Sequence, residues 1–187
     1  MTAGSLNTQG GNITAANIDT ETLTGKWADF YGNVSGNLSL RDSTNYVYKW
    51  TWTPASGGEV CLSTASAFNF DAATTASTAT MNTAWGFGTA ADNFPNTYNT
   101  TCGTALDFSQ ISVSSSTPAA ALQGSSTYTS CAINNGAGTG KDNHAFCTHI
   151  NSAGTAYNSI PSNYEVMVPT SPTPNTVDTY YFYAELN

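Results

Sequence analysis

The sequence has very little charge, and positive charge is the scarcest. Lys and Arg together number 4 among 187 residues, and charged residues make up 9% of the chain, where an ordinary soluble domain carries about 25%. So few cations cannot neutralise a row of phosphates or hold an anionic membrane surface. We therefore expect no nucleic-acid partner.

Long apolar runs are also missing. The sequence has no stretch of about 20 apolar residues that could cross a membrane. Residues 1–11 have neither the basic start nor the apolar stretch of a signal peptide. We expect no membrane insertion of this chain, and a secreted protein would appear here without its leader.

Hydroxyl and amide side chains carry the polarity instead. Ser, Thr and Asn number 69, or 37% of the chain. The chain is also 40% hydrophobic and 12% aromatic, which is enough to fill a core and argues against disorder. This composition favours a protein that lives outside the cell and packs closely against copies of itself.

The cysteines point to the same compartment. Their number is even (four), and none forms a C-x-x-C pair, so we expect two disulfides formed in an oxidising environment. Three pairings are open. The short Gly-rich loop between Cys131 and Cys147 favours that pair, with Cys61–Cys102 as the other.

The residue pattern predicts an all-β protein, with a β-sandwich or jelly-roll fold. Val34, Leu38 and Leu40 alternate with polar residues, as in a half-buried strand over 33–41. A turn at 42–45 and a second strand over 46–53 complete a hairpin. Further strands are expected at 59–63, 108–114, 128–133, 144–150, 164–168 and 176–186. The segment 71–90 is compatible with a short helix or a long loop.

We expect one domain over residues 21–187. Residues 1–20 precede it as an extension, which is either a flexible terminus or a strand donated to a neighbouring copy. Strand addition to an open sheet edge is a general mode of association.

Candidate functional residues are few. N-x-S/T sequons make four asparagines candidates for glycosylation, namely Asn12, Asn33, Asn37 and Asn99. Glu165 and Glu185 are the best pair that the sequence offers for glycoside hydrolysis, but no catalytic pattern surrounds them. Trp50, Trp52 and Trp85 would form a sugar-binding face if exposed, or part of the core if buried. We expect no metal, no cofactor and no catalysis.

The stretch Leu23–Trp50 contains GKWADFYGNVSG, followed by a strand that ends in Tyr-Lys-Trp. It resembles a segment of secreted surface proteins of archaea and some thermophilic bacteria, which carry G-K-W-x-x-(F/Y)-(F/Y)-G-N-V-(S/T)-G. The C-terminal YYFYAEL is similar to the end of the same proteins. The resemblance covers about 35 residues firmly. It implies an extracellular location and a surface or filament role, and it carries over no catalytic residues.

These observations lead to one main functional hypothesis. The chain is expected to be an extracellular structural protein, the self-assembling subunit of a cell-surface filament, sheath or surface layer. Its partners would then be copies of itself, with glycans as a further partner. The alternatives are a secreted carbohydrate-binding or adhesive module and a small jelly-roll glycoside hydrolase.

Overall fold

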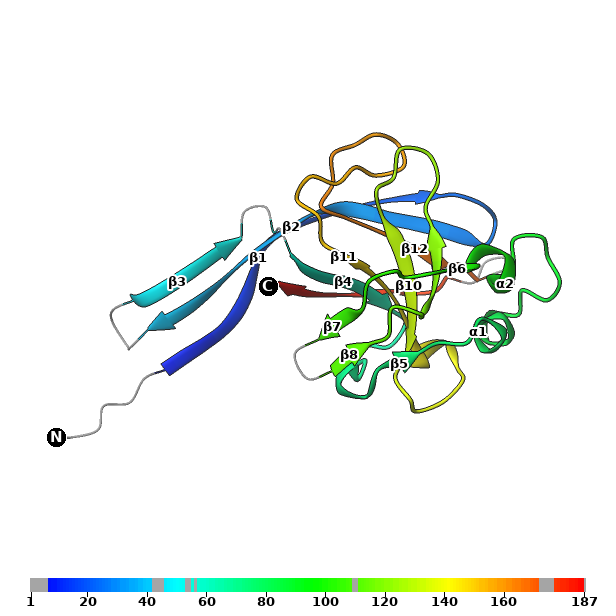
Figure 1. The fold of residues 1–187 in the computed structure, drawn as a ribbon, viewed down its shortest axis with the longest axis horizontal. Helices are drawn as coiled ribbons and strands as arrows, with labels where there is room; N and C mark the ends of the chain where they lie inside the picture. The colour runs from blue at the N-terminus through cyan, green and yellow to red at the C-terminus, as the bar shows by residue number, and fades with distance from the viewer. Residues whose placement is uncertain are drawn as a thin grey trace.

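The computed structural model describes residues 7–41, 46–52, 55, 57–108, 111–171 and 177–186, with the outer parts of the first three strands as backbone only. The chain is mostly β-structure, as predicted (Figure 1). The strands are β1 (Asn7–Thr22), β2 (Trp27–Arg41), β3 (Tyr46–Trp52), β4 (Gly58–Ser63), β5 (Thr74–Thr75), β6 (Thr100–Thr101), β7 (Leu106–Phe108), β8 (Ile111–Val113), β9 (Pro118–Ala121), β10 (Thr129–Asn134), β11 (His144–His149), β12 (Tyr164–Pro169) and β13 (Tyr181–Leu186). The helices are α1 (Thr78–Trp85) and α2 (Phe94–Thr97), with 3-10 turns η1 (Phe70–Ala72) and η2 (Lys141–Asn143).

The front sheet is organised by β2, which is long enough to carry three partners. β1 runs antiparallel along one side of β2, from Asn7 opposite Arg41 to Thr22 opposite Ala28. On the other side, β12 pairs with the first part of β2 and β3 with its last part. The predicted hairpin of β2 and β3 is confirmed, and the predicted turn at 42–45 lies outside the described residues.

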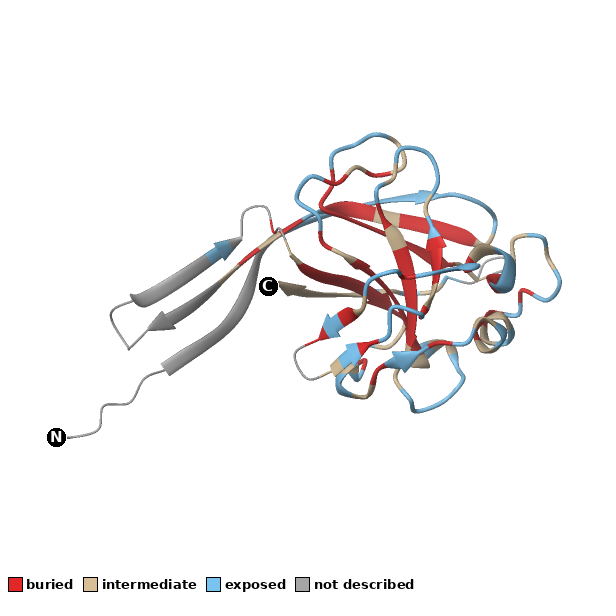
Figure 2. Ribbon diagram, in the orientation of Figure 1, coloured by how far each residue is buried: buried red, intermediate tan, exposed pale blue. Residues whose placement is uncertain are grey.

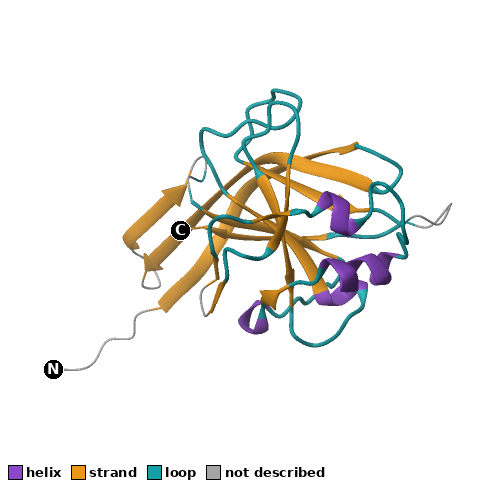
Figure 3. Ribbon diagram, turned by 45° about the vertical axis from the view of Figure 1, so that its right-hand side comes forward, coloured by secondary structure: helices purple, strands orange, loops and turns teal. Residues whose placement is uncertain are grey.

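A three-stranded arm projects from the molecule. It consists of β3 and the outer parts of β1 and β2, which extend beyond the packed layers in two views (Figures 1 and 3). We define the arm as residues 7–15 and 36–52, and the rest of the chain as the body. The strands of the arm are joined to one another by antiparallel ladders.

The back sheet has the strand order β13-β4-β11-β10-β9-β6, with β5 beside β10. Its centre is buried on both faces (Figure 2): every residue of β4 and all of β11 except His149 are buried. One face packs against the front sheet. The other is covered by the small hairpin of β7 and β8 and by η1. Because neither face meets water, these strands have no alternation of polar and apolar residues.

The two sheets form a β-sandwich around one hydrophobic core. Val34 and Val166 come from the front sheet, Phe146 from the back sheet, and Phe94 from α2. Trp27, at the start of β2, meets Phe94 edge-on with ring centroids 4.9 Å apart. This aromatic contact helps to hold α2 against the sandwich.

Both disulfides are formed, but the expected pairing is wrong. A long-range disulfide joins Cys61 to Cys147, 86 residues apart, and a short-range disulfide joins Cys102 to Cys131, 29 residues apart. Cys147 lies opposite Cys61 on β4 and opposite Cys131 on β10. In an antiparallel sheet a residue is close to only one of two such neighbours, at the non-hydrogen-bonded position. That neighbour is Cys61, whose Cα lies 4.1 Å away.

Two expected strands take a different form, and the segment 71–90 contains the short helix that was one of its two expected forms. The strand expected over 108–114 is instead the hairpin of β7 and β8, and the last strand begins at Tyr181 rather than at 176. Between 71 and 90 the chain forms α1. The Ser77 side chain caps the first turn of α1, and Gly86 ends the helix at φ 68°, a left-handed conformation that glycine adopts easily.

Most of the expected N-terminal extension is β1. Its partner here is β2 of the same chain. Donation of this strand to a neighbouring copy remains a prediction.

Candidate functional site

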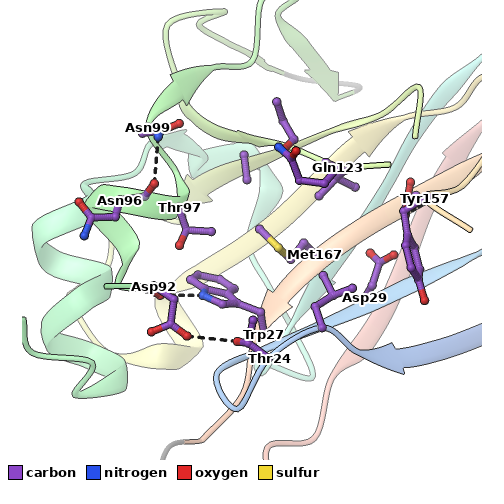
Figure 4. Close-up of a pocket in the computed structure, with 15 residues that line it drawn as sticks. Thr24, Trp27, Asp29, Asp92, Asn96, Thr97, Asn99, Gln123, Tyr157 and Met167 are labelled. Atoms are coloured by element: carbon purple, nitrogen blue, oxygen red, sulfur yellow. Dashed lines mark hydrogen bonds between the residues drawn. The ribbon is translucent and has the colours of Figure 1, made fainter. Parts of the chain in front are cut away.

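A cavity of about 390 Å³ opens in the body between the front sheet, α2 and the end of β9. Asp29 and Tyr157 lie on one side of it and Asn96 and Thr97 of α2 on the opposite side, with Met167 between them (Figure 4). The remaining lining residues are Leu23, Thr24, Trp27, Asp92, Asn99, Ala120, Ala121, Leu122, Gln123 and Glu165.

Two carboxyl groups form the buried end of this cavity. Asp29 on β2 lies opposite Met167 on β12, and Glu165 precedes Met167 by two residues. The two acids are therefore diagonal neighbours on one face of the sheet. Asp29 is 1% exposed and Glu165 is fully buried.

The two carboxyls differ in their hydrogen bonds. Glu165 accepts one bond from the main-chain N–H of Tyr157, at 3.0 Å, and another from the hydroxyl of Ser126. Neither oxygen of Asp29 accepts a well-formed hydrogen bond from any described residue. Its polar neighbours are the carboxyl of Glu165 and the main-chain N–H of Phe30. The two carboxyls are held together only if a proton lies between them.

Burial raises the pKa of Asp29 to about 9, from an ordinary value of 3.8. The neighbouring carboxyl of Glu165 adds to the rise through a hydrogen bond and through charge repulsion. Two carboxylates at this separation cannot both ionise without a large cost. Asp29 is therefore the protonated partner at neutral pH.

A third carboxyl lies next to the pair. Glu21 lies directly opposite Asp29 on the neighbouring strand β1. It accepts a hydrogen bond from the hydroxyl of Tyr157. This bond is the main reason why the pKa of Tyr157 is raised above its usual range. Tyr157 thus ties the Glu21 and Glu165 carboxyls together, through its hydroxyl and its main-chain N–H.

The mouth of the cavity is held by an ion pair. Lys26 Nζ lies 2.9 Å from Asp92 Oδ1, and the contact lowers the pKa of Asp92. The indole N–H of Trp27 donates to the main-chain oxygen of Asp92 at 2.7 Å. These contacts fasten the loop before α2 to the start of β2.

The structure does not bring together the two glutamates expected as a hydrolytic pair. Glu165 lines the cavity in the front sheet, whereas Glu185 lies on β13 of the back sheet, opposite Glu59. The partner that Glu165 does have, Asp29, is within hydrogen-bonding range. Glycosidases need about 5 Å or more between their carboxyls, so this spacing does not favour hydrolysis of sugars.

Sequence reasoning missed Asp29. A signal was present, because Asp29 alternates with Trp27 and Tyr31 on the face of β2 that is buried. An acid between two large aromatic residues of a strand indicates a buried carboxyl. Nothing in the sequence indicates that Glu165, more than 130 residues later, lies beside it.

The other expected residues are scattered over the chain. Asn33 and Asn99 are exposed and Asn37 is half-buried, while the side chain of Asn12 lies outside the described part. Trp85 is 2% exposed and packs in the core, so it cannot form a sugar-binding face. The side chains of Trp50 and Trp52 also lie outside the described part.

Comparisons with known proteins name no family. No family model, curated protein or solved structure matches the chain. The resemblance to archaeal and thermophile surface proteins therefore remains a prediction. Among the described residues there is no cluster of three acidic, His or Cys side chains arranged to hold a metal, and no helix with the length and apolarity of a membrane span.

Proposed function

We propose that the protein is an extracellular structural subunit that assembles into a cell-surface filament, sheath or surface layer by exchange of β1. In this assembly β1 of one copy leaves its own β2 and pairs with β2 of the next copy. The observation that carries the proposal is the weak packing of β1 in the body.

Every residue of β1 from Ala16 to Thr22 is exposed, although the strand pairs with β2 along its whole length. Main-chain hydrogen bonds therefore hold this part of the strand, with a few polar contacts such as Tyr164 Oη to the main-chain oxygen of Asn17, at 2.9 Å. All of these interactions re-form when β1 pairs with another copy, so exchange costs little at equilibrium.

The connection between β1 and β2 can act as the hinge. Leu23 and Thr24 close it through their main-chain N–H groups, which both donate to the oxygen of Trp27. A Cβ at Gly25 would meet no atom within 4 Å, so the outer side of the turn is open, while Thr170 holds its main chain by hydrogen bonds to the oxygens of Gly25 and Lys26. Opening it would place β1 in line with β2, where it reaches away from its own body.

The charge distribution favours contact between the arm of one copy and the body of another. The arm holds two of the four cations, Arg41 and Lys49, and one of the twelve acids, which gives a net charge of +1. The body is left with −9. Such opposite charges steer two copies into a head-to-tail contact, which does not close into a ring unless the rotation permits it.

The extracellular part of the proposal is supported by the disulfides and by the surface chemistry. Two disulfides are present, which is typical of oxidising compartments. The exposed sequon residues Asn33 and Asn99 offer attachment points for glycans. The resemblance of Leu23–Trp50 to surface proteins points in the same direction.

A cysteine pair tests the exchange. Asn17 and Asn33 are opposite each other on β1 and β2, and both are exposed. The variant Asn17→Cys/Asn33→Cys is allowed to assemble, oxidised, viewed by negative-stain microscopy and run on a non-reducing gel. We expect fibres and a ladder of cross-linked multimers, because the two cysteines of each contact come from different copies.

The single variants Asn17→Cys and Asn33→Cys are the controls, since neither can give more than a cross-linked dimer. Fibres that run as monomers with an internal cross-link would rule out exchange of β1. A purified chain that forms no fibres at all would contradict the assembly proposal itself.

A further inference from the structure

We propose that the cavity beside Asp29 and Glu165 binds a primary ammonium group carried on a short apolar stem. The proposal concerns the cavity as it stands with β1 paired to its own β2, and it does not require that the chain polymerises. It rests on the buried carboxyl pair, on the lack of well-formed hydrogen bonds to Asp29, and on the composition of the cavity walls.

The first argument is the missing donor. Buried polar groups in proteins are almost always hydrogen-bonded, yet neither oxygen of Asp29 accepts a well-formed hydrogen bond from a described residue while Asp29 is 1% exposed. Its neighbours are the carboxyl of Glu165 and, more weakly, the main-chain N–H of Phe30. Glu165, beside it, is already supplied with two donors. A ligand that enters the cavity therefore needs to bring donors to Asp29, and an ammonium group brings three.

The second argument is the missing cation. Two lysines have described side chains, and both are engaged away from the pair: Lys26 with Asp92 at 2.9 Å and Lys141 with Asp178 at 2.8 Å. The charges of Glu165 and Glu21 both act on Asp29, and neither of the two described lysines is paired with any of these three acids. A ligand with positive charge compensates this group of acids, whereas an anion would be repelled.

The third argument separates an organic cation from a metal ion. Calcium takes six to eight oxygen ligands, and the described residues offer no cluster of three carboxyl, His or Cys groups in a metal-binding arrangement. The cavity walls instead include the apolar side chains of Leu23, Leu122 and Met167. These walls suit the methylene stem of an amine.

The far end of the cavity is polar. Asn96 and Thr97 of α2 and Asn99 after it lie across from Asp29 (Figure 4). An alkylamine of about four carbons would place its ammonium group at the carboxyl pair and its stem past Met167. A free amine and the lysine side chain of a second copy share this chemistry, and Lys49 in the arm is the candidate lysine.

Proton release distinguishes this site from a simple apolar cavity. The titratable groups that face Asp29 are Glu21, Tyr98, Tyr157 and Glu165. Without ligand, Asp29 keeps its proton up to a pKa of about 9, and ammonium binding displaces that proton. As the pH is raised toward 9, the affinity should then rise about tenfold for each pH unit, because the ionised fraction of Asp29 rises by that factor.

The test is a titration of the full chain with n-butylammonium at pH 6, 7 and 8, in which binding is monitored by the NMR chemical shifts of the cavity residues. We expect saturable chemical-shift changes, and an affinity for n-butylammonium that rises about tenfold for each unit of increase in pH. n-Butanol, which has the same stem without the charge, should give none. Asp29→Asn should abolish binding while its spectrum stays dispersed, and the exposed Asp71→Asn should bind like the parent chain.

Four results would overturn the proposal. Equal binding of n-butanol would mean that the cavity is merely apolar, and an affinity independent of pH would mean that Asp29 does not receive the amine. Calcium chloride that moves the same resonances when the amine does not would assign the carboxyls to a metal. A proton release of zero in unbuffered solution, measured on the unmodified protein, would contradict the mechanism without any variant.

A second arm of the experiment identifies the source of the ammonium group. If Lys49 of a neighbouring copy is the ligand, Lys49→Gln should weaken self-association, and n-butylammonium should compete with assembly of the parent chain. If a free amine is the ligand, Lys49→Gln should leave both assembly and amine binding unchanged. Both outcomes support the ammonium site, and only the titration above can refute it.

Discussion

Asp29→Asn is the substitution that most directly tests the protonation of the buried carboxyl pair. The folded chain holds a proton on Asp29 up to a pKa of about 9, whereas the unfolded chain releases it above the ordinary value of 3.8. Between these two values a rise in pH favours the unfolded state. One proton of difference lowers the free energy of unfolding by about 1.4 kcal/mol for each pH unit.

The asparagine variant keeps the shape of the side chain and cannot ionise, so it lacks this slope. Between pH 5 and pH 8, the free energy of unfolding of Asp29→Asn should rise by about 4 kcal/mol relative to that of the parent chain, which is three pH units at the slope above. Near pH 4 the two chains should differ little. Contributions from His144 and His149 occur in both chains and cancel in the difference.

The assay is equilibrium urea unfolding at pH 5, 6, 7 and 8 with both disulfides intact. Asp71→Asn, at an exposed position, serves as the control and should follow the parent chain at every pH. A difference between Asp29→Asn and the parent that stays constant from pH 5 to pH 8 would refute the reasoning. It would mean that Asp29 is already ionised in the folded protein.

Other substitutions test the back sheet. Glu59 raises the pKa of His149, so Glu59→Gln should lower that pKa in an NMR titration. The pKa of His144, which burial depresses, should not change. The charged pair stabilises the fold below the ordinary pKa of 6.5, and this contribution is lost as the pH rises through the raised value. Gly58→Ala should lower the free energy of unfolding by about 1–3 kcal/mol, because Gly58 has φ 101° and a Cβ there would overlap a main-chain oxygen of β13. Gly25→Ala is the control and should be neutral, because a Cβ at Gly25 would lie in open space. Equal effects of the two substitutions in denaturant unfolding would contradict the argument. Replacing the long-range disulfide by two alanines should cost about 1 kcal/mol more than replacing the short-range one, since the loops are 86 and 29 residues long and chain entropy grows with loop length; the reverse order of unfolding midpoints would refute this.

Local patterns in the sequence were enough to predict the hairpin of β2 and β3. Each strand of that hairpin follows its neighbour along the chain, and its residues alternate with a period of two. The strands β4, β10 and β11 of the back sheet and β12 of the front sheet were also located to within two residues at either end, from short apolar runs between turn residues. Their order in space was not predictable, because β4 pairs with β11 and β13, which follow it by more than 80 residues.

The sequence by itself determined the chemical class of this protein: a weakly charged, hydroxyl-rich, β-forming chain with cysteines for two disulfides. These properties depend on composition and on residues close together in the chain. Only the tertiary structure decided that Cys147 bonds to Cys61 rather than to Cys131, because both lie opposite it and only the geometry of the ladder separates them. In the same way, the meeting of Asp29 with Glu165 depends on the pairing of β2 with β12 across 136 positions, and no local pattern encodes that register.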